Sequence, residues 1–183
     1  MEVLFRIKYD SGRNMFDGLD MYYGANSLAA LSEFMLVAAH AFINEEIVVR
    51  APAARGFRIV LGKNSIGSLE QIIQLVVTDS ETLSLLTDLG KSGLYDLLKY
   101  AFCSLLGIPW AIKNKKAKKK ILALMQENED LLQRLENALL TAHSPVKYQG
   151  YTVALSLGRQ PLSHSMIPLL STWKQRLLSL VVR

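Results

Sequence analysis

The sequence predicts an α+β fold, in which an antiparallel or mixed sheet of about four to five strands is packed by a long apolar central helix and a C-terminal helical layer. Apolar side chains alternate with polar ones in several short segments, which indicates half-buried strands. Apolar residues recur every three or four positions in several longer segments, which indicates helices. We expect the 183 residues to form a single domain, with a strand-rich part at 1–78 and a mainly helical part at 79–183.

The first part should supply most of the strands and the central helix. Residues 2–9 alternate between apolar and polar side chains and predict a strand. Residues 28–44 are apolar or small on nearly every side, which is typical of a central helix, and Asn26 or Ser27 can cap it. Three extended runs follow at 46–51, 56–61 and 69–78, and the last of them also fits a helix.

The second part should be mainly helical. Asp79 or Ser80 can cap a helix, and Gly90 and Gly93 predict a break before a second helix. The remaining elements are a helix over 121–142, a strand over 149–157 and a terminal helix over 166–182.

The net charge of +5 comes from one short segment. Without it, 15 cationic and 16 acidic residues nearly balance. Cations at the beginning of a helix oppose its macrodipole, so their position does not favour the helix itself. The segment is either a solvated helix start or a surface that contacts nucleic-acid phosphate or another polyanion. The candidate anion-binding residues are Lys113, Lys115, Lys116, Lys118, Lys119 and Lys120.

A second candidate surface lies on the two C-terminal helices. Residues 121–142 fit a heptad pattern with one polar residue, Asn128, at an a position, which is a known way to fix the register of paired helices. The apolar stripe is wide enough to fit ordinary packing within the chain as well. The candidate interface residues are Ile121, Leu124, Asn128, Leu131, Leu135, Leu170, Trp173 and Leu177.

The sequence contains no combination of residues that is typical of a catalytic site. The segments Gly62-Lys63-Asn64 and Gly90-Lys91-Ser92 lack the glycine spacing of a phosphate loop. The three histidines are not spaced as helical metal ligands. We therefore expect no enzymatic activity, no cofactor and no metal, and we interpret His40 as a hydrogen-bonded core histidine.

The sequence also indicates the cellular compartment in which the protein resides. The first residues lack the basic and then apolar order of a secretory signal, and a single cysteine, Cys103, suits a reducing environment. The most apolar window, at 83–112, contains four charged residues and does not resemble a membrane span. We expect a cytoplasmic protein without a membrane span.

Three short segments and the apolar helix between them carry a resemblance. They are Phe5-Arg6-Ile7-Lys8-Tyr9-Asp10, Arg55-Gly56-Phe57-Arg58-Ile59 and Gly67-Ser68-Leu69-Glu70. Roughly the first 110 residues resemble a group of uncharacterised bacterial proteins found in mobile-element or defence contexts. The resemblance implies a component of a bacterial assembly and transfers no activity.

These observations predict a non-enzymatic interaction or assembly subunit that acts as a homo-oligomer or within a larger bacterial complex, in defence. The alternative is a nucleic-acid-binding accessory protein that uses the lysines at 113–120.

Overall fold

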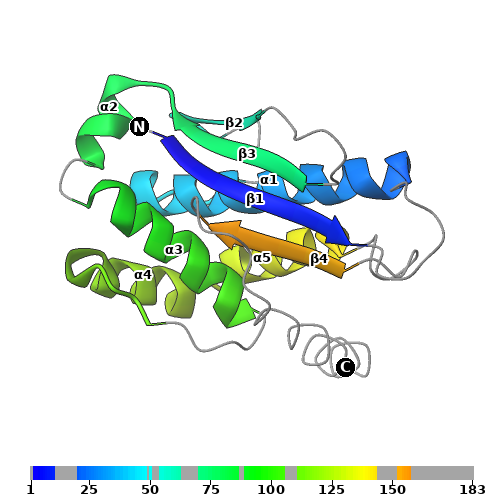
Figure 1. Ribbon diagram of the computed structural model, residues 1–183. Helices are drawn as coiled ribbons and strands as arrows, with labels where there is room; N and C mark the ends of the chain where they lie inside the picture. Colours follow the sequence, from blue (N-terminus) through cyan, green and yellow to red (C-terminus); the bar gives the residue numbers. More distant parts are fainter. Residues whose placement is uncertain are drawn as a thin grey trace.

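The computed structural model describes residues 2–10, 20–48, 50, 54–62, 70–86, 89–105, 111–143 and 152–157. Most of the helices follow one another between the third and the last strand, so the predicted α+β class is confirmed (Figure 1). In chain order the elements are β1 (Glu2–Asp10), α1 (Met21–Asn44), β2 (Phe57–Leu61), β3 (Glu70–Val77), α2 (Ser80–Leu85), α3 (Gly90–Leu105), α4 (Lys115–Glu127), α5 (Glu129–Ala142) and β4 (Thr152–Leu157).

The strands lie side by side in the order β2-β3-β1-β4, and each neighbouring pair is antiparallel. Phe5 of β1 is opposite Ile73 of β3, and Val3 is opposite Leu75, so these four apolar residues lie on one face of the sheet. That face is fully buried at Val3, Phe5, Ile7, Tyr9, Phe57, Ile73 and Leu75.

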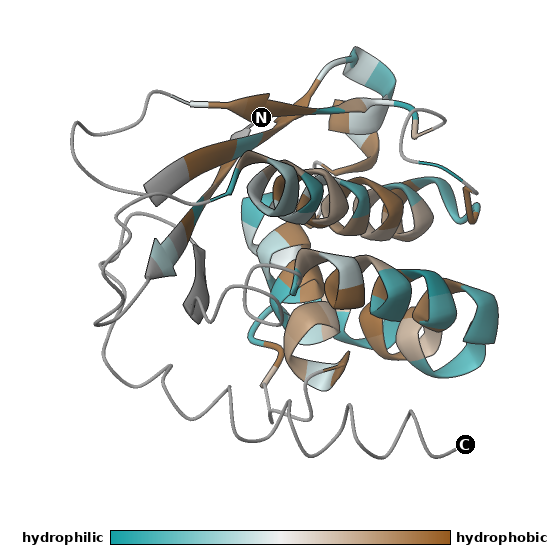
Figure 2. Cartoon of the chain, turned by 90° about the vertical axis from the view of Figure 1, so that its right-hand side faces the viewer, coloured by the Kyte–Doolittle hydropathy of each residue, from teal (hydrophilic) through white to brown (hydrophobic). Residues whose placement is uncertain are grey.

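The helices cover this apolar face, so that the sheet and the long helices form separate layers (Figure 2). Helix α1 is the central element and contacts β2, α3, α4 and α5. It is long and apolar enough to cross a membrane by length and composition alone, and 67% of its most apolar window is buried inside the fold. This burial is what the central helix of a packed domain requires.

Two predictions about the first part are wrong. Helix α1 begins at Met21, well before residue 28, because the side chain of Asp20 accepts hydrogen bonds from the N–H groups of Tyr22 and Tyr23 and caps the helix. The strand expected at 46–51 is not formed by residues 46–48 or 50. Val48 is buried against the core instead, so its apolar character serves packing and not strand pairing.

The helix expected at 121–142 is two helices, and the first of them begins at Lys115. Asn128 separates them, because its backbone (φ −116°, ψ 86°) is not helical. Its side-chain amide donates to the carbonyl of Leu124 (3.0 Å) and satisfies the end of α4. Asn128 is therefore a helix boundary and not a polar position in a paired heptad.

The remaining predictions are confirmed, corrected in part or outside the described residues. The segment at 69–78 is the strand β3 and not a helix. Helix α3 begins at Gly90 and runs through Gly93, so the break lies ahead of both glycines. The predicted terminal helix at 166–182 lies outside the described residues.

A buried chain of hydroxyl groups joins three elements. The Tyr9 hydroxyl of β1 donates to Oγ of Ser27 in α1 (3.0 Å), and that hydroxyl donates to the carbonyl of Ala142 at the end of α5 (2.6 Å). Ser27 is thus a core linker and not a helix cap, although the sequence offered Asn26 or Ser27 for that role. Burial raises the pKa of Tyr9 above its ordinary value, and the bond to Ser27 offsets part of that effect.

The raised pKa of Tyr9 predicts a specific loss of stability in alkali. The unfolded phenol ionises near 10.0 and the folded one at higher pH. The stabilisation from the protonated phenol is therefore complete below pH 10 and is lost as the pH rises through the raised pKa. We expect Tyr9→Phe to lower the free energy of unfolding by about 1 kcal/mol at neutral pH. The loss should shrink above pH 10, as measured by urea unfolding across pH; a loss that stays constant with pH would contradict this.

Candidate anion-binding surface

The lysine-rich segment forms the first turns of α4. Asn114 is the N-cap, and its Oδ1 accepts a hydrogen bond from the N–H of Ala117 (3.0 Å). Ala117, Ile121 and Met125 recur every four residues and are buried, so this side of the helix packs on the core. The lysines between them are left on the remaining sides, where solvent reaches them.

Asn114 also binds the beginning of α3. Its Nδ2 donates to the carbonyl of Leu89 (2.9 Å) and to Oγ of Ser92 (2.8 Å). Its backbone N–H donates to the buried carboxylate of Asp96. Every polar atom of the Asn114 side chain is thus engaged. The carboxylate of Asp96 also places a negative charge close to the N-terminus of α4, where it is favourable.

The two helices approach closely because small residues face each other. A Cβ added at Gly93 would lie 3.0 Å from Cβ of Leu89 and 3.5 Å from Cβ of Ala117. The absence of a side chain at Gly93 therefore allows α4 to sit against the first turn of α3. The beginnings of α3 and α4 consequently lie together at one end of the molecule (Figure 1).

This arrangement adds a cation that the sequence analysis did not count among the anion-binding candidates. Lys91, in the first turn of α3, is exposed and is the neighbour of Ser92, which Asn114 contacts. None of the exposed lysines at the two helix starts forms an ion pair with a described residue. We call this set the lysine cluster; it consists of Lys91, Lys113, Lys115, Lys116, Lys118 and Lys119.

Lys120 does not belong to the lysine cluster, although the sequence placed it among the anion-binding candidates. Its ammonium group lies 2.9 Å from a carboxylate oxygen of Glu45 and 5.2 Å from the centre of the Phe42 ring. The hydrogen bond and the charge of Lys120 lower the pKa of the Glu45 carboxyl. Glu45 is the C-cap of α1 and has a positive φ of 56°. Lys120 therefore attaches α4 to the end of α1.

The candidate interface residues are distributed differently from the prediction. Ile121, Leu131 and Leu135 are fully buried in the core of their own chain, so they are not accessible to a partner, and the prediction is wrong for them. Leu124 and Asn128 are half-buried. Leu170, Trp173 and Leu177 lie outside the described residues.

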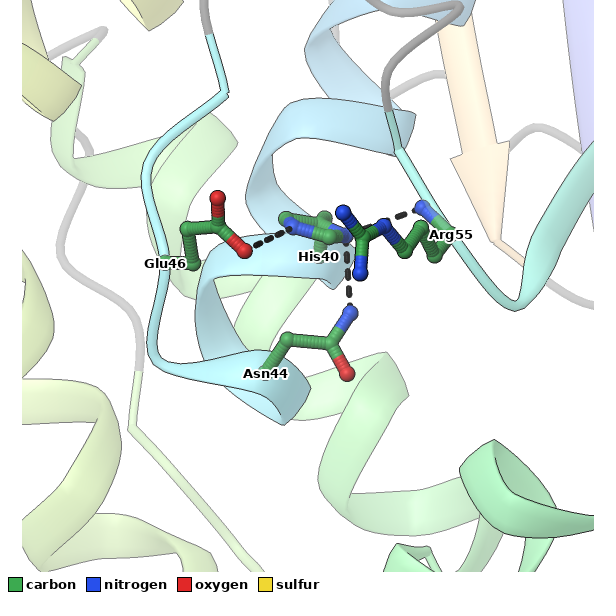
Figure 3. A network of polar contacts seen from close by, with 4 residues as sticks. All are labelled: His40, Asn44, Glu46 and Arg55. Atoms are coloured by element: carbon green, nitrogen blue, oxygen red, sulfur yellow. Dashed lines mark hydrogen bonds and ion pairs between the residues drawn. The ribbon is translucent and has the colours of Figure 1, made fainter.

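The polar contacts of His40 fit the interpretation as a core histidine (Figure 3). Its Nδ1 accepts a hydrogen bond from the backbone N–H of Arg55 (3.0 Å) and lies 2.7 Å from Nδ2 of Asn44. Because Nδ1 is an acceptor, the neutral ring carries its proton on Nε2, which lies 3.7 Å from a carboxylate oxygen of Glu46. His40 therefore ties the segment before β2 to the end of α1.

Three further features of the described residues bear on chemistry. They contain no group of three or more His, Cys, Asp or Glu residues that could hold a metal ion. A groove of about 310 Å³ lies between α1 and α5, and its lining includes Ala30 and Glu33 of α1 and Arg134 and Ala138 of α5. Cys103 is half-buried, and burial raises the pKa of its thiol, which disfavours the reactive thiolate.

The contacts of Asn114 predict a graded effect of substitution. Asn114→Ala removes the cap and both bonds to α3, and should lower the free energy of unfolding by about 2 kcal/mol. Asn114→Ser keeps a capping oxygen but is too short to reach Leu89, so it should recover about half of that loss. Urea unfolding of both variants measures the difference, and equal losses would show that the bonds to α3 do not contribute.

Comparison with known proteins gives one match. Residues 5–166, which are 162 of the 183, match a family described as a domain of unknown function, DUF7946. No curated protein and no solved structure matches the chain. The match covers all the described elements from Phe5 onward, including α3, α4 and the lysine cluster. The chain therefore belongs to the DUF7946 family.

Proposed function

We propose that the protein is a non-enzymatic interaction protein that binds the phosphate backbone of nucleic acid through the lysine cluster. The observation that carries this proposal is the meeting of two helix starts, which brings exposed Lys91 of α3 to the same end of the molecule as the exposed lysines of α4. Nucleic-acid surfaces draw their cations from several elements in this way, whereas a solvated run of charge belongs to one element.

The type of side chain indicates what the surface would contact. Ammonium groups on flexible stems bind phosphate oxygens as point charges and carry no information about base sequence. No aromatic residue in the described part of α4 accompanies the lysines, so base stacking has no platform there. Trp110 lies outside the described residues. We therefore propose binding that depends on charge and not on sequence.

The role would be that of an accessory component and not of a catalyst. The resemblance of the first 110 residues to bacterial proteins of mobile-element or defence contexts agrees with such a role, because these contexts involve nucleic acid. The lysine cluster lies mostly beyond that stretch, so the two arguments are independent.

The proposal is tested by fluorescence anisotropy with duplex and single-stranded probes at several salt concentrations. Six lysines predict a slope of log affinity against log salt of at most about −5 on duplex DNA. The triple variant Lys115→Gln, Lys116→Gln, Lys119→Gln should make this slope shallower by up to about 3 and weaken binding to all probe sequences alike.

Lys91 provides a sharper test, because it lies on α3 and not in the lysine-rich segment. Lys91→Gln should weaken binding by a factor of about 2 to 10, as expected for one phosphate contact. The matched control is Arg58→Gln, which removes an exposed cation from β2 and should leave binding unchanged. Absence of binding at low salt, or equal effects of the two single variants, would contradict the proposal.

A further inference from the structure

The charges of α4 are arranged against its own macrodipole at both ends. Its first turn contains lysines and no acidic residue, and its last turn contains Glu127 and no basic residue. The N-terminus of a helix is its positive end and the C-terminus its negative end, so both groups of charges are unfavourably placed. An antiparallel neighbour of the same kind would reverse both effects.

The exposed charges also form a stripe that is symmetric about one small residue. Lys116, Lys119, Ala123 and Glu127 follow each other at spacings of three, four and four residues, so they lie on one face of α4. The lysines and Glu127 are exposed, and Ala123 is half-buried. Asp130, exposed in the first turn of α5, adds a further carboxylate just after the break at Asn128. Ala123 is at the midpoint, with cations on one side and carboxylates on the other.

We infer that this face of α4 pairs with the same face of a second copy of the chain in antiparallel orientation, crossing at Ala123. Lys119 of each copy would then meet Glu127 of the other, because both residues lie one helical turn from the crossing. Lys116 lies further along the same face of α4, on the side of the crossing that faces the carboxylate-bearing end of the partner's helix. The small side chain of Ala123 lets the two helices approach at the crossing point.

The charge complementarity favours a second copy over an unrelated partner, since one stripe supplies both signs at matching distances from its centre. The contact is limited to one helix face and is smaller than a standard protein interface, so the dimer should be weak, with a dissociation constant on the order of 100 µM at low salt. The dimer would cover Lys116 and Lys119, and nucleic acid would compete with it. The inference goes beyond the proposed function and does not require it.

Analytical ultracentrifugation of the full chain tests the inference. The wild type should be a monomer–dimer equilibrium between about 10 µM and 1 mM protein at low salt, and a monomer at about 500 mM NaCl, where surface charges are screened. A monomer throughout this range at low salt, or a dimer unaffected by salt, would overturn it.

Charge reversal makes the test specific to the stripe. Lys116→Glu with Lys119→Glu, and separately Glu127→Lys with Asp130→Lys, should each weaken dimerisation at least ten-fold by opposing like charges. A mixture of the two variants should form a heterodimer, which a misfolded variant could not do. The matched controls are Lys118→Glu, which is exposed on another side of α4, and Glu33→Lys, which is exposed on α1; both should dimerise as the wild type.

The same variants separate this inference from the proposed function. Glu127→Lys with Asp130→Lys should weaken the dimer at least ten-fold and leave duplex binding intact or stronger, whereas Lys118→Glu should weaken duplex binding and leave the dimer intact. If each charge-reversed variant still forms a dimer when it is measured by itself, another surface is responsible. That result would overturn the inference, whether or not the protein binds nucleic acid.

Discussion

The side chain of Asn114 holds the beginnings of two helices together. Its oxygen caps α4, and its nitrogen binds the carbonyl of Leu89 and the hydroxyl of Ser92 at the start of α3. The buried carboxylate of Asp96 completes the contact by accepting from the backbone N–H of Asn114. Only an amide side chain of this length offers an acceptor and two donors in these directions. The position of every lysine in the lysine cluster depends on this contact.

The rest of the structure fixes α4 at a second point. Lys120 binds Glu45 at the end of α1, and α1 in turn is attached to the sheet by its apolar side chains and by the link from Tyr9 through Ser27. One lysine of the segment is therefore structural, while its neighbours remain exposed. Like charges held close together on a fixed helix repel each other, and an anionic partner would relieve that repulsion.

Much of the fold could be predicted because it rests on local patterns. The alternation in β1 and β2 and the apolar character of α1 are visible in the sequence, as is the position of the lysines at a helix start. The break at Asn128 was missed because the apolar periodicity continues across it, and only the bond from its amide to Leu124 reveals that the helix ends. Residues 46–48 were misread because their β-branched side chains fit a buried loop as well as a strand.

The candidate site was predictable only in part, for a similar reason. The lysines of α4 are adjacent in sequence, but Lys91 joins them only through the contact between Asn114 and Ser92 across 22 residues. Conversely, Ile121, Leu131 and Leu135 have the spacing of an interface, and only tertiary packing shows that the chain buries them itself. Gly90-Lys91-Ser92 fails as a phosphate loop, yet the same lysine has a place in the lysine cluster.

The central claim is that the starts of α3 and α4 act as one cationic surface. Titration of the isotopically labelled protein with a short DNA duplex, followed by amide chemical shifts, tests it most directly. The account predicts that residues 90–93 and 113–119 shift together, with one common binding curve. Shifts at 113–119 without any at 90–93, or shifts centred on the groove between α1 and α5, would contradict it.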